Sequence, residues 1–267
     1  MFGAIIGDII GSRFEFANNK KSKEFELFNK ECRNTDDTVM SLAICKALME
    51  CKGNYSELSN KAIKNMKQLG EKYPLAGYGE MFSKWLVEEN AKPYNSFGNG
   101  SAMRVSAVAY EATTIDEAKK LSKIVTEVTH NHPEGIKGAE AISVAIFLAR
   151  IGKNKKQIKE YIEKNYYTLD FSIDEIRENY SFDVTCQGTV PQALECFLES
   201  NNFEDAIRIA ISLGGDSDTI GAMVGSIAEA YYGVPNYIKE SAVNYLDDFL
   251  YNIVKEFEIY YLNKIKE

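Results

Sequence analysis

The sequence predicts an all-α protein built as a single domain, and three observations lead to this fold class. Apolar residues recur at helical spacing through most of the chain. Strand-like alternation is confined to short stretches such as residues 180–186, and no Asn-Gly turn has strands on both sides. No low-complexity linker divides the 267 residues, a length that suits one large core.

Seven segments carry the helical pattern most clearly. Glycine follows several of them at a position where a helix can end, as Gly53 follows the first. Pro235 precedes the last segment, whose apolar stripe continues through Phe249 to Ile253 and predicts one long helix. In chain order the segments are residues 39–52, 56–69, 115–128, 135–151, 203–213, 219–232 and 236 onward.

Two apolar segments carry glycine at four-residue spacing. Gly3, Gly7 and Gly11 form one stripe, and Gly221 and Gly225 form the other. Glycine inside a helix costs about 1 kcal/mol relative to alanine, so such a stripe needs a compensating role. Because missing side chains let two backbones approach closely, we expect the two stripes to lie in the same tightly packed core.

Composition limits the classes of function and the compartment. The net charge of −8 and a pI near 5.1 argue against nucleic-acid binding, which needs clustered Lys and Arg. The five cysteines include no Cys-x-x-Cys pair and are predicted to be reduced packing residues. The apolar N-terminus lacks a basic leader and is interrupted by Asp8, so we expect neither a signal peptide nor a membrane span, but a cytoplasmic protein.

Two segments crowd carboxylates and hydroxyls just before a predicted helix: Asn-Thr-Asp-Asp-Thr at 34–38 and Gly-Gly-Asp-Ser-Asp-Thr at 214–219. Helix capping is one explanation, although one cap needs only one such side chain. Four carboxylates brought together repel each other unless cations neutralise them. Oxygen ligands without thiolate favour Mg²⁺ or Mn²⁺. Together the two segments predict a site for hard divalent cations.

Two further segments suggest ligand contacts. Small residues at 98–104, Gly-Asn-Gly-Ser-Ala-Met-Arg, would let backbone N–H groups approach an anion, and Arg104 is either a phosphate partner or an inward-facing structural residue. The only two histidines, His130 and His132, lie in one loop without a third zinc ligand. His130 is therefore a candidate for either a ligand hydrogen bond or a helix cap. Glu15, taken from its own segment alone, is a surface residue.

The order of these motifs resembles the ADP-ribosylglycohydrolase family. From Gly7 to Gly233, the matching elements are GDIIGSRFE, NTDDT, GNGSAMR, THNHP, TVPQAL and GGDSDTIGAMVGSIAEAYYG. The resemblance implies a single-domain orthogonal helical bundle over residues 1–267 and a dinuclear Mg²⁺ or Mn²⁺ centre.

The resemblance also implies roles for individual residues. It puts Glu15 at the mobile acidic position that the family holds over its metals, where Glu15 acts as acid or base or as a gate; Glu15 and Asp37 are the predicted catalytic residues. The implied metal ligands are Thr35, Asp36, Asp37, Asp216, Asp218 and Thr219. The implied ADP-ribose contacts are Gly98, Asn99, Gly100 and Ser101, on the diphosphate-binding loop, and His130.

The implied activity is hydrolysis of the bond between ADP-ribose and an acceptor side chain, with arginine preferred. Serine-linked ADP-ribose or small ADP-ribosyl esters are alternative substrates, and a non-catalytic ADP-ribose-binding protein is an alternative function. A haloacid-dehalogenase-like phosphohydrolase is a further alternative, but that fold requires α/β alternation. The expected partner is an ADP-ribosylated protein or small-molecule conjugate, with no nucleic acid or membrane, and the expected state is a monomer.

Overall fold

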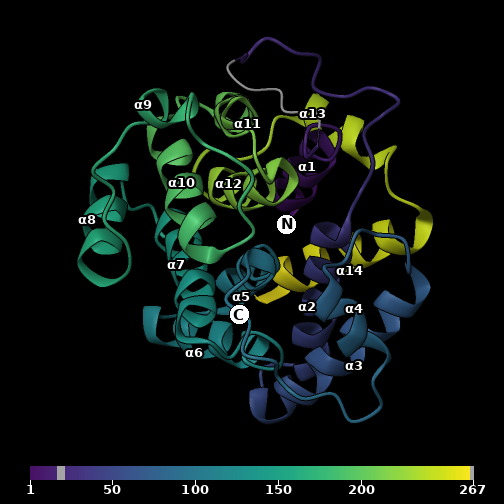
Figure 1. Cartoon of the computed structure of the whole chain (residues 1–267). Helices are drawn as coiled ribbons and strands as arrows, with labels where there is room; N and C mark the ends of the chain where they lie inside the picture. The colour runs from purple at the N-terminus through teal and green to yellow at the C-terminus, as the bar shows by residue number, and fades with distance from the viewer. Residues whose placement is uncertain (17–21, 265–267) are drawn as a thin grey trace.

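Helices make up the regular structure of the protein. The structure, a computed structural model, describes residues 1–16 and 22–264, and within these ranges no β-strand is present (Figure 1). One isolated antiparallel bridge joins Gly98 to Thr185. The predicted all-α class is confirmed, and an α/β phosphohydrolase fold is excluded for the described part of the chain.

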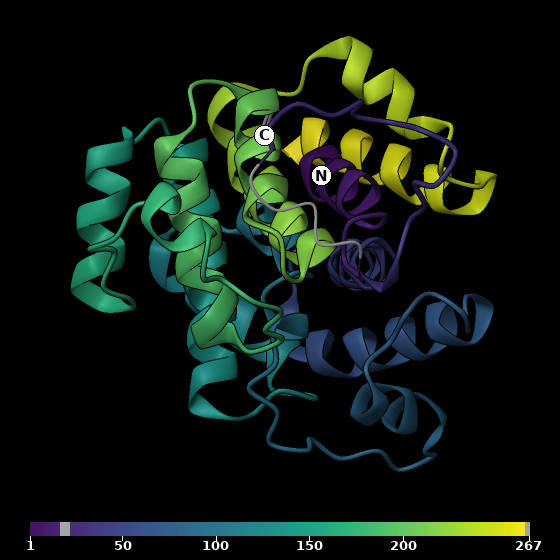
Figure 2. The ribbon, with the colours of Figure 1, turned by 45° about the horizontal axis from the view of Figure 1, so that its top comes forward.

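The helices cross one another around a shared core (Figure 2). In chain order they are α1 (Phe2–Gly11), α2 (Asp36–Cys51), η1 (Tyr55–Glu57), α3 (Leu58–Lys72), α4 (Glu80–Val87), η2 (Asn99–Ser101), α5 (Ser106–Glu111), α6 (Ile115–Thr126), α7 (Pro133–Arg150), α8 (Lys155–Asn165), α9 (Ile173–Arg177), α10 (Cys186–Glu199), α11 (Phe203–Leu213), α12 (Ser217–Tyr232), α13 (Asn236–Val243) and α14 (Asp248–Lys264).

The predicted helix from residue 236 onward is two helices, so that prediction is wrong. α13 ends at Val243, and α14 begins at Asp248. Asp247 lies between them, and its Oδ1 accepts a hydrogen bond of 2.9 Å from the Leu250 N–H, as a cap does at the start of a new helix. Phe249, placed on the predicted stripe, is 39% exposed.

The two glycine stripes lie against each other in the pair α1 and α12, which neighbour each other in both ribbon views (Figures 1 and 2). A Cβ atom added at Gly7 would lie 1.9 Å from the Gly221 carbonyl oxygen, and one added at Gly3 would lie 2.0 Å from the Gly225 carbonyl oxygen. Only glycine permits this backbone contact. The predicted shared core is confirmed.

The side chain of Glu229, in the last turns of α12, accepts the N–H of Gly3 at 2.8 Å. The contact satisfies one of the free N–H groups at the start of α1. It also fixes the register of the two helices, and this register carries the opposite end of α1 to the start of α12.

All five cysteines are buried free thiols, as predicted for packing residues. In the described part of the chain, no helix combines the length and the apolar character that crossing a bilayer requires.

Candidate active site

A cavity of about 460 Å³ opens where the starts of α2 and α12 meet. It is within the usual size of small-molecule sites. Segments distant in sequence build its walls, and all of the predicted site residues line it except Thr35 and Ser101. The predicted residues on the wall are Glu15, Asp36, Asp37, Gly98, Asn99, Gly100, His130, Asp216, Asp218 and Thr219.

Two groups of three carboxylates lie at the acidic end of the site. Asp8, Asp37 and Asp218 form one group, and Glu15, Asp216 and Asp218 form the other; within each group the oxygen atoms lie within 4.8 Å of one another. Asp218 belongs to both groups. Adjacent oxygen clusters that share a carboxylate suit two hard cations held side by side.

The charge state of these carboxylates also fits cation binding. Burial, then the charge of Asp218, raises the pKa of Asp37 well above its usual value. Burial, then the charge of Asp216, does the same to the pKa of Asp218. Oδ1 of Asp37 is buried without a hydrogen-bond partner, which is costly unless a cation binds there. Within residues 1–16 and 22–264, the clustered carboxylates form no ion pair with Lys or Arg; they are Asp8, Glu15, Asp36, Asp37, Asp216 and Asp218.

Asp8 is the member that sequence reasoning missed. It lies fully buried in α1, and its carboxylate accepts the Thr35 N–H at 2.9 Å, the Thr35 hydroxyl at 2.7 Å and the Thr38 N–H at 3.1 Å. The Thr38 hydroxyl donates to it as well. Asp8 thus holds the first turn of α2 and orients Asp36 and Asp37 toward the cavity. A carboxylate in an otherwise apolar helix was the available signal.

The predicted threonine ligands differ in their surroundings. Thr35 directs its hydroxyl to Asp8 and accepts the Asp37 N–H at 3.3 Å, as the N-cap of α2. Thr219 lies on the cavity wall, and its hydroxyl donates to Oδ2 of Asp37 at 3.1 Å. This bond joins the starts of α2 and α12 across 182 positions of sequence.

The glycine loop, residues 98–101, forms another part of the cavity wall. Asn99 donates from Nδ2 to Asp216 Oδ2 at 2.6 Å and so connects the loop to the acidic cluster. Ser101 is fully buried, and its hydroxyl lies 3.0 Å from the Gly98 carbonyl oxygen and 2.9 Å from the Gly135 carbonyl oxygen. Its side chain therefore shapes the loop from behind.

His130 faces this loop, whereas His132 does not. His132 is instead the N-cap of α7, and its Nδ1 accepts the Glu134 N–H at 3.1 Å. His130 is buried, and its ring lies 5.6 Å from that of Tyr94. Burial, then the nearby Arg104 guanidinium, lowers the pKa of His130 well below its usual value, so the imidazole is neutral.

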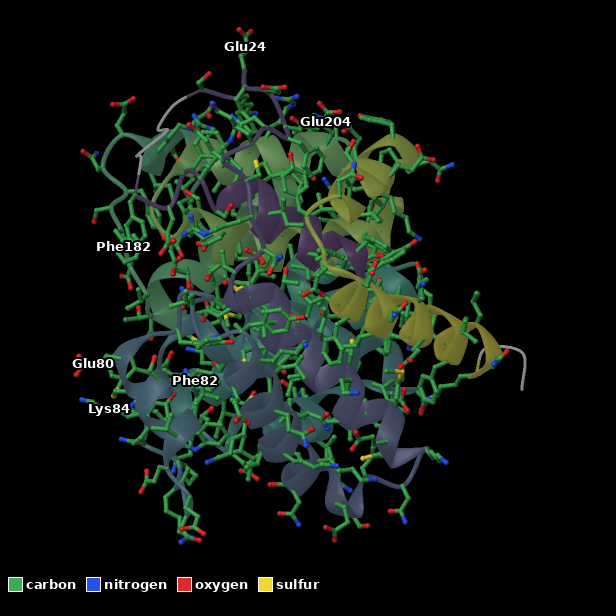
Figure 3. All side chains as sticks on the ribbon, turned by 90° about the vertical axis from the view of Figure 1, so that its right-hand side faces the viewer. Glu24, Glu80, Phe82, Lys84, Phe182 and Glu204 are labelled. Atoms are coloured by element: carbon green, nitrogen blue, oxygen red, sulfur yellow. The ribbon has the colours of Figure 1, made fainter. Side chains whose placement is uncertain are left out.

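Two exposed side chains from different segments line the cavity, Phe182 and Glu80, and Glu80 forms an ion pair with Lys84 at 2.6 Å. Figure 3 shows Phe182, from the segment before α10, and Glu80, from the start of α4, at the same edge of the molecule. Phe182 is 48% exposed and stacks on Phe16 with ring centroids 6.0 Å apart. Neither Phe182 nor Glu80 was predicted from sequence, because both lie outside a recognisable motif.

Divalent cations are expected to stabilise the fold. Mg²⁺ or Mn²⁺ at about 100 times its dissociation constant adds about 2.7 kcal/mol, which for a chain of this length raises Tm by roughly 5–10 °C. Thermal unfolding in EDTA and in each cation, at constant ionic strength, measures the shift. The double variant Asp37→Asn with Asp218→Asn is expected to lose it. An equal shift in that variant would show that the cations act elsewhere.

The neutral, buried His130 makes stability depend on pH. Its folded pKa lies below the unfolded value of about 6.5, so only the unfolded chain takes up this proton as the pH falls. The histidine therefore costs nothing at pH 8 and lowers the unfolding free energy below about pH 6.5, by up to about 1.4 kcal/mol per pH unit. Urea unfolding at pH 8, 6.5 and 5 is expected to show a shallower decline in His130→Gln than in wild type. An equal decline in the unfolding free energy of the two proteins with falling pH would contradict a neutral His130.

The chain and its fold have relatives among known proteins. The ADP-ribosylglycohydrolase family model matches residues 1–262. ADP-ribosylhydrolase ARH3 of Gallus gallus is 25% identical over 313 residues, covering 86% of this chain and 83% of that protein. ADP-ribosylarginine hydrolase Tri1 of Pseudomonas putida (strain GB-1) is 26% identical over 277 residues, covering 91% of this chain and 73% of that protein. A solved structure described as an ADP-ribosylglycohydrolase-related protein complex has the same fold, with a TM-score of 0.60, 20% identity and coverage of 94% and 95% of the two chains.

Proposed function

The chain belongs to the ADP-ribosylglycohydrolase family, and on this premise we propose that it is a hydrolase that releases ADP-ribose from arginine side chains with the help of two divalent cations. One observation carries the proposal. The cavity joins two carboxylate groups that share Asp218 to a glycine loop faced by a neutral histidine. The acidic end suits cations and ribose hydroxyls, and the loop suits a diphosphate.

Arginine is the acceptor that the observations favour. One relative is named an ADP-ribosylarginine hydrolase. The cavity wall also carries Glu15 in addition to its aspartates, and this acidic surface favours a guanidinium over a neutral serine oxygen. ADP-ribosyl-serine and small ADP-ribosyl esters are the competing substrates.

Six residues of this chain would supply the oxygen ligands for the two cations. Asp36, Asp37, Asp216 and Asp218 would hold them, and Thr35 and Thr219 would complete the set. Bound Mg²⁺ or Mn²⁺ would supply Lewis-acid chemistry: orientation of the distal ribose hydroxyls and a lower pKa for water at the site.

The remaining chemistry belongs to protein side chains. Cleavage at the anomeric carbon passes through an oxocarbenium-like state, which needs a proton donor or acceptor beside the bond. Glu15 is half-buried at the cavity wall, and burial, then the charge of Asp218, raises its pKa to about 7. A carboxyl group with that pKa can hold or accept a proton at neutral pH. Asn99 keeps Asp216 oriented, and the glycine loop leaves room for the diphosphate.

A panel of defined substrates tests the proposal. Arginine-, serine- and cysteine-linked ADP-ribosyl peptides are incubated with Mg²⁺ or Mn²⁺, and free ADP-ribose and inorganic phosphate are measured. We expect metal-dependent release of ADP-ribose, fastest from the arginine linkage. Preference for the serine linkage would identify serine as the acceptor and would leave the proposed hydrolysis of ADP-ribose unchanged. Release of phosphate alone, or tight binding of ADP-ribose without turnover of any linkage, would overturn the proposal.

A further inference from the structure

Arg104 is a buried cation in the wall of the cavity, beside the glycine loop. Its Nη2 donates to the Thr129 hydroxyl oxygen at 2.7 Å and to the Val125 carbonyl oxygen at 3.3 Å, while its Nε has no partner. The guanidinium carbon lies 5.7 Å from the centre of the Phe82 ring. No carboxylate among the described residues forms an ion pair with Arg104, and its printed hydrogen-bond partners are neutral groups.

Thr129 connects this cation to His130. Its hydroxyl oxygen lies 2.7 Å from Arg104 Nη2 and 2.7 Å from Nδ1 of His130. A guanidinium only donates, so the hydroxyl oxygen accepts from Arg104 and has a single proton left to donate. Two acceptors compete for that proton: His130 Nδ1 and the Thr126 carbonyl oxygen.

The competition favours the histidine. The Thr126 carbonyl lies 3.4 Å from the Thr129 hydroxyl and already accepts the N–H groups of Thr129, at 3.2 Å, and His130, at 2.9 Å. The distance to His130 Nδ1 is 2.7 Å, that of a strong bond. A proton donated to Nδ1 makes that nitrogen the acceptor, and the ring proton of the neutral imidazole is then on Nε2.

We propose that Arg104 and Thr129 are positioning residues that hold His130 in the neutral Nε2–H tautomer, so that one N–H points at the Gly98–Gly100 loop and donates to the diphosphate of ADP-ribose. The identity of the anion rests on the proposed function. The direction of Nε2 rests on the fold: Cβ atoms built at Gly98 and Gly100 would lie 3.5 and 3.4 Å from it.

The cation has a second effect on the same ring. An imidazolium beside a buried guanidinium is unfavourable, and burial disfavours it further, which lowers the pKa of His130. His130 therefore donates as a neutral group over the working pH range, and its hydrogen-bonding does not vary with protonation. With the opposite tautomer, Nε2 would be a lone-pair acceptor and would repel an anion at the loop.

The tautomer can be measured on the full chain without any ligand. Long-range ¹H–¹⁵N NMR distinguishes Nε2–H from Nδ1–H, and His132→Gln assigns the His130 signals because the chain has two histidines. We expect Nε2–H in the wild type and a mixture of tautomers in Thr129→Val. A wild-type Nδ1–H tautomer would overturn the proposal.

Binding of ADP-ribose, measured by calorimetry in the presence of Mg²⁺, tests the consequence. Loss of one oriented hydrogen bond in Thr129→Val is expected to weaken binding about tenfold, and Thr129→Ser is expected to restore both affinity and tautomer. Thr126→Val is the matched control, because the Thr126 hydroxyl is buried without a partner. Equal weakening in the control, or full affinity in Thr129→Val, would refute the positioning role.

Failure of the proposed function gives a different result. A wild-type protein that shows the Nε2–H tautomer but binds no ADP-ribose contradicts the ligand, whereas one that binds ADP-ribose with the Nδ1–H tautomer contradicts the positioning role. Should Thr129→Val not fold, the wild-type tautomer and the Thr129→Ser affinity still decide the proposal.

Discussion

Replacing Asp218 by asparagine is expected to lower kcat/KM for ADP-ribosyl-arginine at least about a thousandfold, since the cations contribute several kcal/mol of transition-state stabilisation. Asp218 is the carboxylate that both acidic groups share, so its loss weakens both cation sites at once. Asparagine keeps the shape of the side chain and its Oδ1 acceptor, which in the wild type lies 3.0 Å from the Thr219 backbone nitrogen. The fold is therefore expected to survive the change.

Stability measurements separate a lost cation site from a lost fold. In EDTA, Asp218→Asn is expected to be at least as stable as wild type, because it removes a buried charge from a repelling cluster. Added Mg²⁺ should stabilise it less than wild type. Asp170→Asn, an exposed position, is the control for the chemical change itself. Metal-dependent turnover within tenfold of wild type would refute the central role of Asp218.

Gly7→Ala is expected to destabilise the protein by about 3 kcal/mol or more, at the upper end of overpacking effects. The added Cβ would lie 1.9 Å from the Gly221 carbonyl oxygen and 2.1 Å from its carbon, and both are backbone atoms. Alanine stabilises an isolated helix by about 1 kcal/mol relative to glycine. Packing thus predicts a lower free energy of unfolding and helix propensity a higher one, and the backbone overlap is much the larger effect.

Urea unfolding of Gly7→Ala and Gly79→Ala measures the difference. Gly79 has an ordinary φ of −60°, and a Cβ added there meets nothing within 4 Å. Its replacement is expected to change the unfolding free energy by less than about 0.5 kcal/mol. A small effect at both positions would mean that α1 and α12 can separate at little cost. Gly7→Ala is also expected to reduce cation binding, because the end of α1 packs against Ser217 and Asp218.

Periodicity and composition were sufficient for much of the fold. Segment 203–213 was predicted with the bounds that α11 has, because its polar start and apolar stripe are both strong. The glycine stripes predicted a long-range contact, since few other arrangements compensate for glycine in a helix. The break before α14 was missed because a local cap at Asp247 overrides a continuous apolar stripe.

The candidate site was predictable where its residues cluster in sequence. Two aspartates and a hydroxyl within a few residues signal more than a cap, so both acidic segments could be recognised. Asp8 could not, because its role depends on α1 lying against the first turn of α2. Phe182 could not either, since an irregular segment has no periodicity to predict which side chains reach the cavity. For Arg104 the sequence left two roles open, and its contact with Thr129 could not be predicted because it depends on how the two segments pack.

The bond between Thr219 and Asp37 has a consequence for biosynthesis. It closes a loop of 182 positions, and the Asn99–Asp216 bond closes one of 117. Closing long loops is slow and comes late in folding. On the ribosome, the acidic turn of α2 is complete long before its partner has been synthesised. Until α12 emerges, the nascent chain lacks Asp216 and Asp218, so neither carboxylate group can form. We therefore expect cation binding to come at the end of folding, and a chain truncated before α12 to be inactive.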